Sequence, residues 1–220
     1  MDDVKILSHV DHTLLTPTAT WTEIKQLCDD AIKYNTASVC VPPCYVERIR
    51  AAYLNLNICT VIGFPLGYNA PAVKTFETIT AIYHGANEID MVINIADVKN
   101  GDFDRVEAEI TQMKGETGSR ILKVIIETCY LTEEEKIKLC KVVTNAGADY
   151  IKTSTGFGTA GATLADVKLF MEHIGPNVKV KAAGGIRSRE DMVAFLEAGC
   201  DRLGTSSAVK ILTGGDARGY

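Results

Sequence analysis

The sequence predicts an α/β protein with one (β/α)8 barrel, the fold also called a TIM barrel. Two observations lead to this prediction: short β-rich apolar runs alternate with amphipathic segments, and eight such runs occur along the 220 residues. Alternation of this kind favours a parallel sheet, and eight strand–helix units close a barrel. No change in composition marks a second domain. We therefore expect a single domain over residues 1–220, ending in a short, flexible Gly-rich tail at about 213–220.

The predicted strands are short runs rich in Val, Ile and Leu. In chain order they are 9–15, 36–42, 57–65, 87–94, 121–128, 149–154, 177–183 and 201–206. The segments between them have the apolar periodicity of helices that bury one face. The clearest of these segments are 21–34, 70–85, 103–116, 132–147, 163–175 and 188–199.

Helix start and end signals fit these boundaries. A Ser or Thr with an acidic residue three positions later is a typical N-cap, and glycine suits the left-handed backbone that follows a helix. The start signals are Thr20 with Glu23, Thr132 with Glu135, Thr163 with Asp166 and Ser188 with Asp191. The end signals are Gly85, Gly147, Gly175 and Gly199.

Composition and charge exclude several classes of protein. The formal net charge of −5 gives no basic balance, so we expect no nucleic-acid partner. The N-terminus lacks a positive region followed by an apolar run, which excludes a signal peptide, and no apolar run reaches the roughly 18 residues of a membrane helix. We expect a cytoplasmic protein with no membrane partner. The seven cysteines contain no C-x-x-C pair, so we interpret them as reduced thiols and expect no metal site.

Residues of a strand alternate between the two faces of the sheet. In the strand 87–94, Ile89, Met91 and Ile93 share the face expected to contact the helices, so the opposite face must point into the barrel. The same alternation in the other strands predicts a set of charged residues in the lumen or at its mouth. They are Glu88, Asp90, Lys123, Glu127, Lys152, Lys179, Lys181 and Arg202. Both signs of charge are present, so ion pairs can offset much of the cost of burial.

Position along the strands divides this set in two. The residues expected deeper in the barrel, where they would fill it as ion pairs, are Glu88, Lys123, Lys179 and Arg202. Lys152, Lys181 and Asp90 lie nearer the C-terminal ends of their strands, where barrel enzymes assemble their chemistry. These three are the candidate catalytic residues.

Two neighbouring lysines point to Schiff-base chemistry. A free lysine has a pKa near 10.4, but burial and a second ammonium group both favour the neutral amine, which attacks carbonyl carbons. The iminium that forms is an electron sink, so a carbon–carbon bond β to it can break or form. Asp90 is suited to shuttle protons through a water. The spacing leaves open whether Lys152 or Lys181 is the nucleophile, and the chemistry requires neither metal nor cofactor.

The glycine-rich segments favour a phosphate site over a dinucleotide site. Residues 156–161, GFGTAG, match G-x-G-x-x-G after a strand, but the next strand carries lysines where a dinucleotide fold needs an acidic residue. The loops after the seventh and eighth strands of a barrel often bind phosphate. The candidates there are Gly184, Gly185, Ser206 and Ser207, with Arg187 as a charge partner.

Seven motifs occur in order along the chain: DHTLL, VCVPP, EIDMVIN, LKVIIET, IKTSTGF, KAAGGIR and GTSSA. From Asp11 to about Ser207 the chain closely resembles the deoxyribose-phosphate aldolases. The resemblance implies a (β/α)8 barrel and the reversible cleavage of 2-deoxy-D-ribose 5-phosphate to acetaldehyde and D-glyceraldehyde 3-phosphate. The residues alone lead only to class I aldolase chemistry on a phosphorylated substrate, and the identity of the sugar comes from the resemblance.

The resemblance also implies roles for individual residues. Lys152 would carry the Schiff base, Lys181 would tune it and Asp90 would relay protons. The positions that match those around the sugar phosphate are Thr155, Gly156, Gly184, Gly185, Ser206 and Ser207. Some relatives use a C-terminal tyrosine to move the substrate proton, which makes Tyr220 a further catalytic candidate.

Two positions are expected to distinguish this chain. Some relatives carry a lysine where this chain has Phe157, so backbone dipoles and Arg187 must balance the phosphate charge. Cys40 ends the second strand with lumen parity and is expected to be a small packed thiol.

Two other functions fit parts of the pattern. One is a metal-free isomerase of another sugar phosphate, in which the lysines act only through their charge. The other is a sensor of a phosphorylated ligand without turnover. The trio Lys152, Lys181 and Asp90 favours the aldolase. The expected partners are small-molecule sugar phosphate and aldehyde substrates, with a homodimer as one candidate assembly.

Overall fold

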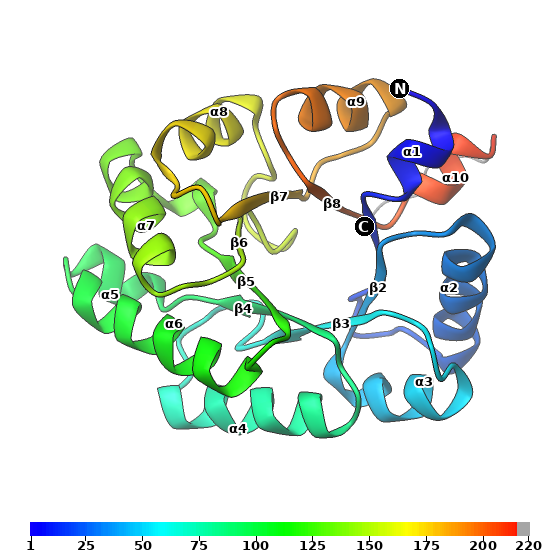
Figure 1. Cartoon of the computed structure of the whole chain (residues 1–220), viewed down its shortest axis with the longest axis horizontal. Helices are drawn as coiled ribbons and strands as arrows, with labels where there is room; N and C mark the ends of the chain where they lie inside the picture. Colours follow the sequence, from blue (N-terminus) through cyan, green and yellow to red (C-terminus); the bar gives the residue numbers. More distant parts are fainter. Residues whose placement is uncertain (215–220) are drawn as a thin grey trace.

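The structure, a computed structural model, describes residues 1–214. Eight parallel strands form a closed barrel in which each strand pairs with its neighbours in sequence, and β8 pairs with β1 (Figure 1). The strands are β1 (Val10–Thr13), β2 (Ser38–Val41), β3 (Ile58–Ile62), β4 (Glu88–Val92), β5 (Ile121–Ile125), β6 (Tyr150–Lys152), β7 (Lys179–Ala183) and β8 (Arg202–Thr205). The predicted (β/α)8 barrel is confirmed, with each strand shorter than its predicted run.

Helices surround the barrel on its outside (Figure 1). The α-helices are α1 (Asp3–Leu7), α2 (Trp21–Tyr34), α3 (Val46–Ala52), α4 (Pro71–Tyr83), α5 (Ile95–Lys99), α6 (Phe103–Thr117), α7 (Glu133–Asn145), α8 (Leu164–His173), α9 (Arg189–Glu197) and α10 (Ala208–Leu212), and two 3-10 turns are η1 (Pro43–Tyr45) and η2 (Thr128–Tyr130). All six predicted helices are present. Of the other four, α10 begins at the end of the GTSSA motif, and the short helices α1, α3 and α5 were not predicted, because five to seven residues carry too little periodicity to detect.

The predicted N-caps are confirmed. At α7, the Thr132 side chain accepts a hydrogen bond from the Glu135 N–H at 3.3 Å, and the Thr132 N–H donates to the Glu135 carboxylate at 2.7 Å. The end signal at Gly175 was wrong. Gly175 is not left-handed, because α8 ends in an extended residue, Ile174, and the Gly175 N–H donates to the Thr144 hydroxyl at 2.9 Å.

The strands bury two different faces. The outer face is apolar, and Ile89, Met91 and Ile93 are fully buried in the core between strands and helices, as the alternation predicted. The inner face carries most of the buried charged groups of the barrel. Within residues 1–214, no helix is long and apolar enough to cross a membrane.

Candidate active site

The register of the strands brings the candidate catalytic residues together. Lys152 on β6 is the direct partner of Lys181 on β7, and Asp90 on β4 is the partner of Lys123 on β5. Partner residues in parallel strands project to the same side of the sheet. All four side chains therefore enter the lumen, where Asp90, Lys123 and Lys181 are fully buried and Lys152 is 2% exposed.

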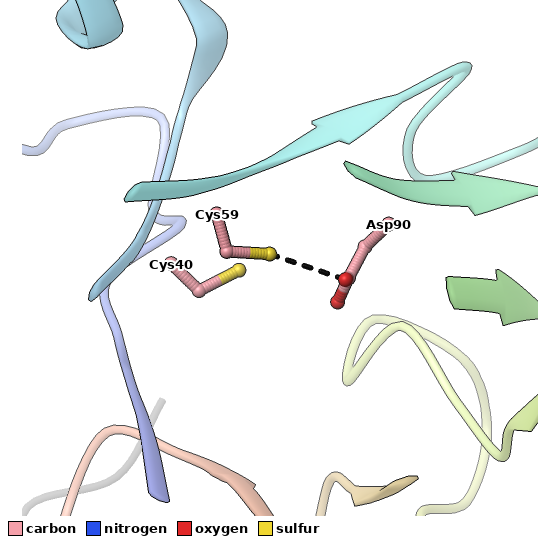
Figure 2. A group of neighbouring side chains, drawn as sticks. All are labelled: Cys40, Cys59 and Asp90. Carbon is pink, nitrogen blue, oxygen red and sulfur yellow. Dashed lines mark hydrogen bonds between the residues drawn. The ribbon is translucent and has the colours of Figure 1, made fainter. Parts of the chain in front are cut away.

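Asp90 is the centre of this group. Its Oδ2 atom accepts hydrogen bonds from Lys152 Nζ and Lys181 Nζ, each at 2.7 Å. Its Oδ1 atom accepts from Lys123 Nζ at 2.9 Å and from the thiol of Cys59 at 3.1 Å (Figure 2). The three residues predicted to be catalytic are thus in direct contact through one carboxylate oxygen.

Asp11 is a member of the group that was not predicted. Its carboxylate pairs with Lys181 at 2.5 Å and with Arg202 at 2.5 Å, and it accepts from the Ser38 hydroxyl at 2.7 Å. A signal was present, because Asp11 falls on the face of β1 that alternation directs into the lumen. The prediction applied that alternation to the later strands and left β1 out.

The network contains more cations than carboxylates. The lumen ion pairs join four cations, Lys123, Lys152, Lys181 and Arg202, to three carboxylates, Asp11, Glu88 and Asp90. Glu88 lies deepest and pairs with Lys123 at 2.5 Å and with Arg202 at 3.2 Å. The predicted ion pairing of Glu88, Lys123 and Arg202 is confirmed.

The network keeps Asp90 ionised and Lys181 protonated. Burial by itself would raise the pKa of Asp90, but the ammonium groups of Lys123, Lys152 and Lys181 hold that pKa well below its usual range. Burial would lower the pKa of Lys181, but the carboxylates of Asp11 and Asp90 outweigh burial and hold the pKa above its ordinary value. Lys181 is therefore a fixed positive charge next to Lys152.

The prediction for Lys179 was wrong. Lys179 is the first residue of β7, so its side chain leaves the barrel at the N-terminal end instead of entering the lumen. The side chain is 57% exposed and pairs with Asp201 at 3.2 Å. Alternation identifies the face of a strand, but it does not indicate where along the barrel axis the strand begins.

A cavity opens above the amines at the C-terminal ends of the strands. Lys152 lines this cavity, whereas Lys181 and Asp90 lie beneath its surface. All six residues predicted around the sugar phosphate line the same cavity, namely Thr155, Gly156, Gly184, Gly185, Ser206 and Ser207. Arg187 also lines it and is exposed.

The walls of the cavity require glycine at two positions. Gly184 and Gly185 have φ angles of 80° and 76°, which residues with a Cβ atom rarely adopt. A Cβ at Gly184 would also lie 3.2 Å from the Cα of Gly161. Within residues 1–214, the N–H groups of Gly185 and Ser206 have no backbone acceptor. Two free amides therefore border a cavity in which an anion could accept their hydrogen bonds.

Glu127, predicted at the mouth of the barrel, fixes the loop after β6. It is 2% exposed, and its carboxylate accepts from both the N–H and the hydroxyl of Thr155. The Thr155 hydroxyl in turn accepts from the Phe157 N–H at 3.0 Å. Burial raises the pKa of Glu127. This carboxyl group therefore orients Thr155 toward the cavity.

The remaining residues singled out from the sequence are Tyr220, Phe157 and Cys40. Tyr220 lies outside the described residues. Phe157 packs edge-on against Phe64, with ring centroids 5.4 Å apart. Cys40 is fully buried in a small apolar cluster with Leu15, Cys59 and Val61, as expected of a packed thiol.

Two groups of side chains have the composition of a metal site. Cys40, Cys59 and Asp90 bring one ligand atom each within 4.8 Å of one another, and so do Asp11, Cys59 and Glu88. The carboxylates of both groups already bind lysine or arginine side chains. A divalent cation in either position would have to displace these groups and would face the Lys123 ammonium, which makes both poor cation sites.

Comparison with known proteins identifies relatives over the whole chain. The model of the DeoC/LacD family aldolases matches residues 5–208. A protein of Clostridium botulinum (strain Eklund 17B / Type B) named deoxyribose-phosphate aldolase is 63% identical over 221 residues, covering 100% of both chains.

Solved structures agree with this match. An aldolase named QR15 has a TM-score of 0.91 at 39% identity and 95% coverage of both chains. A tetrameric deoxyribose phosphate aldolase from Aeropyrum pernix has a TM-score of 0.87 at 34% identity, covering 96% of this chain and 91% of its own.

The variant Asp11→Asn tests the charge network. We expect a loss of about 3 to 5 kcal/mol in the free energy of unfolding at pH 7, because buried cations lose a counter-charge. Burial alone would raise the pKa of Asp11, but Lys181, Lys123 and Arg202 depress it. The stabilisation is therefore complete above the ordinary Asp pKa of about 4 and is lost as the pH falls below it. Urea unfolding at a series of pH values should show the difference from wild type shrinking below pH 4.

Asp3→Asn is the matched control. Asp3 pairs with Arg189 on the surface, where both side chains are more than 40% exposed, so its loss should cost less than about 1 kcal/mol. Equal losses for the two variants, or a difference that grows below pH 4, would contradict the interpretation.

Proposed function

The chain belongs to the DeoC/LacD aldolase family, and on this premise we propose that it is a class I aldolase of 2-deoxy-D-ribose 5-phosphate. The products are D-glyceraldehyde 3-phosphate and acetaldehyde, and the reaction is reversible. The observation that carries the proposal is the pair of amines, Lys152 and Lys181, bound to one oxygen of Asp90 beneath a glycine-rich cavity. The sugar is the one named for the 63% identical relative.

Lys152 is the proposed nucleophile. Its amine reaches the cavity and has one carboxylate partner, Asp90, whereas Lys181 is fully buried between Asp11 and Asp90. Asp11 and Asp90 hold the pKa of Lys181 above its ordinary value, so Lys181 keeps its proton and stays a fixed positive charge beside Lys152.

The chemistry then follows from the amine. Lys152 Nζ attacks C1 of the open-chain aldehyde, and the carbinolamine loses water to give an iminium ion. Removal of the proton from the C3 hydroxyl breaks the C2–C3 bond, and the electron pair passes to the iminium, which becomes an enamine. Glyceraldehyde 3-phosphate leaves. Protonation of the enamine at C2 and hydrolysis release acetaldehyde and regenerate the Lys152 amine.

Asp90 is the proposed proton relay for these steps. Its Oδ2 atom contacts Lys152 Nζ at 2.7 Å, so it can accept the proton that leaves this amine with little movement of heavy atoms, while Lys181, at the same distance, keeps its own proton. Its depressed pKa makes it a carboxylate that accepts protons and passes them on rather than retaining them. Tyr220 lies outside the described residues, so its part in proton transfer stays a prediction. The cytoplasmic location of the protein also stays a prediction.

The phosphate is proposed to bind at the loops after β7 and β8. The free N–H groups of Gly185 and Ser206, the Ser206 hydroxyl and the side chain of Arg187 are donors at this end of the cavity. The Ser207 hydroxyl lies 3.1 Å from the Thr205 hydroxyl and forms a hydrogen bond with it, so we assign Ser207 to the wall of the cavity and not to the phosphate donors. Peptide dipoles and one arginine thus supply the charge that a lysine supplies in some relatives.

Borohydride trapping tests the covalent step. We expect reduction in the presence of deoxyribose 5-phosphate to leave a stable adduct on the tryptic peptide that contains Lys152. Lys152→Ala should abolish the adduct and lower kcat by at least about a thousandfold, because the nucleophile is lost. The matched control is Lys179→Ala, because Lys179 is an exposed lysine on the neighbouring strand. This variant should form the adduct and keep the kcat of wild type.

Other results of this experiment would identify another function. An adduct on Lys181 would reverse the lysine assignment within the same enzyme class. Turnover of a sugar phosphate without an adduct would point to an isomerase, and absence of both would point to a sensor.

Ser206→Ala tests the phosphate site. Removal of the hydroxyl is expected to raise KM for deoxyribose 5-phosphate by about tenfold, the value of one hydrogen bond to a charged group. The KM for 2-deoxyribose, which lacks the phosphate, should stay within about twofold, because no group then needs this contact. Equal effects on the two substrates would place the phosphate elsewhere.

A homodimer is the proposed assembly, formed through helix α4 on the outside of the barrel (Figure 1). Four apolar side chains of α4 are 46% to 86% exposed: Val73, Phe76, Ile79 and Tyr83. No charged residue of α4 is exposed, since Lys74 is fully buried and Glu77 is half-buried. An uncharged apolar stripe is complementary to itself, which a two-fold interface requires.

Light scattering after size exclusion tests this assembly. Wild type should elute with the mass of two chains, and Phe76→Glu should give one chain, because the charge would be buried at the interface. Met171→Glu, on the exposed surface of α8, should leave the dimer intact. A monomeric wild type would contradict the proposal.

A further inference from the structure

Cys40 and Cys59 lie side by side in the barrel lumen. They are direct partners on β2 and β3, and both are fully buried. Their sulfur atoms lie within 4.8 Å of each other, and both side chains point into the lumen (Figure 2). Neighbouring strands are about 4.8 Å apart, within the range of Cα separations that a disulfide spans. The backbone positions of the two residues are therefore compatible with a disulfide.

The surroundings of the two thiols differ. The neighbouring Cys59 thiol and the ammonium groups of Lys181 and Lys152 lower the pKa of Cys40 against the effect of burial. Burial raises the pKa of Cys59 well above its usual value. Cys40 therefore loses its proton more readily and forms the nucleophilic thiolate, whereas Cys59 stays a thiol. Pairs of a reactive and a resolving cysteine have this arrangement.

A small oxidant can approach this pair from the cavity. Leu15 lines the cavity and belongs to the same apolar cluster as Cys40, Cys59 and Val61, so this cluster extends from the opening to the two thiols. Full burial excludes bulky thiol reagents and disulfides. Hydrogen peroxide, which is nearly as small as water, is the class of oxidant that fits.

We propose that Cys40 and Cys59 are an oxidative modification site, where hydrogen peroxide forms a reversible disulfide inside the barrel. The Cys40 thiolate attacks one oxygen of the peroxide, which breaks the O–O bond and gives a sulfenic acid and hydroxide. The Cys59 thiol then attacks the sulfenic sulfur, forming the S–S bond and expelling water. In total, two thiols are oxidised by two electrons and one peroxide is reduced to two waters.

Oxidation acts on the catalytic carboxylate. The Cys59 thiol donates to Asp90 Oδ1 at 3.1 Å, and its sulfur lies 3.3 Å from Lys123 Nζ. A disulfide has no S–H group, so the Oδ1 atom of Asp90 loses the hydrogen bond from Cys59. The hydrogen bonds from Lys152 and Lys181 to its Oδ2 atom remain. Reversible loss of aldolase activity follows, and this part of the inference depends on the proposed function.

Peptide mapping with Cys44→Ser tests the disulfide. Trypsin places Cys40 and Cys44 in one peptide, 34–48, and Cys59 in the peptide 51–74, so the substitution leaves one cysteine in each. Cys44 is exposed on η1 and has no part in the site. After treatment with peroxide and alkylation of free thiols, we expect peptides 34–48 and 51–74 to be linked. Activity should fall by about tenfold, the effect of one hydrogen bond lost at a reacting group, and dithiothreitol should restore it.

Cys44→Ser/Cys59→Ala is the matched variant. It cannot form the link, and compared with its own untreated sample it should show no loss that dithiothreitol reverses. Unlinked peptides after peroxide treatment, or the same reversible loss in the matched variant, would overturn the disulfide. A link with unchanged activity would overturn its effect on Asp90. The link is measured by mass alone, so failure of the proposed aldolase activity would not be mistaken for failure of the disulfide.

Discussion

The cost of burying charge inside the barrel governs the arrangement of this protein. Lumen positions of a barrel are normally filled by branched apolar side chains, whereas here four cations and three carboxylates occupy them in mutual contact. Asp90 bridges three lysines, and Asp11 bridges Lys181 and Arg202. Loss of one member leaves a buried charge uncompensated. The network therefore holds the amine of Lys152 in one orientation before any substrate arrives.

The two sides of the lumen differ in polarity. On the side of β7 and β8, glycines and free amides line the cavity, which suits an anion. On the side of β1 to β3, Leu15, Cys40, Cys59 and Val61 form an apolar cluster. Lys152 lies where the cavity meets the network. A substrate with a phosphate at one end and a small aldehyde at the other matches this division, which agrees with the substrate named for the relatives.

The same contacts connect catalysis with the state of the thiols. Cys59 donates a hydrogen bond to Asp90 Oδ1, and Cys40 lies beside Cys59. A cysteine outside the proposed reaction therefore contacts the carboxylate that binds both lysines. A fully buried carboxylate is sensitive to each of its donors, because an unpaired polar atom is costly in the low-dielectric interior. This sensitivity is the physical basis for expecting a chemical change at two buried sulfurs to alter the reaction.

From the sequence alone one could predict the fold class, the inward face of most strands and the proximity of Lys152, Lys181 and Asp90, because side chains alternate along any strand and eight strand–helix units close a barrel. Tertiary structure alone decided which charges meet. The register of the neighbouring strands β6 and β7 pairs Lys152 with Lys181, and closure of the barrel brings Asp11 of β1 to Lys181. The start of β7 leaves the Lys179 side chain outside the lumen. The contact of Cys59 with Asp90 was likewise decided by the register of β3 against β4, because periodicity within one strand holds no information about its height relative to another.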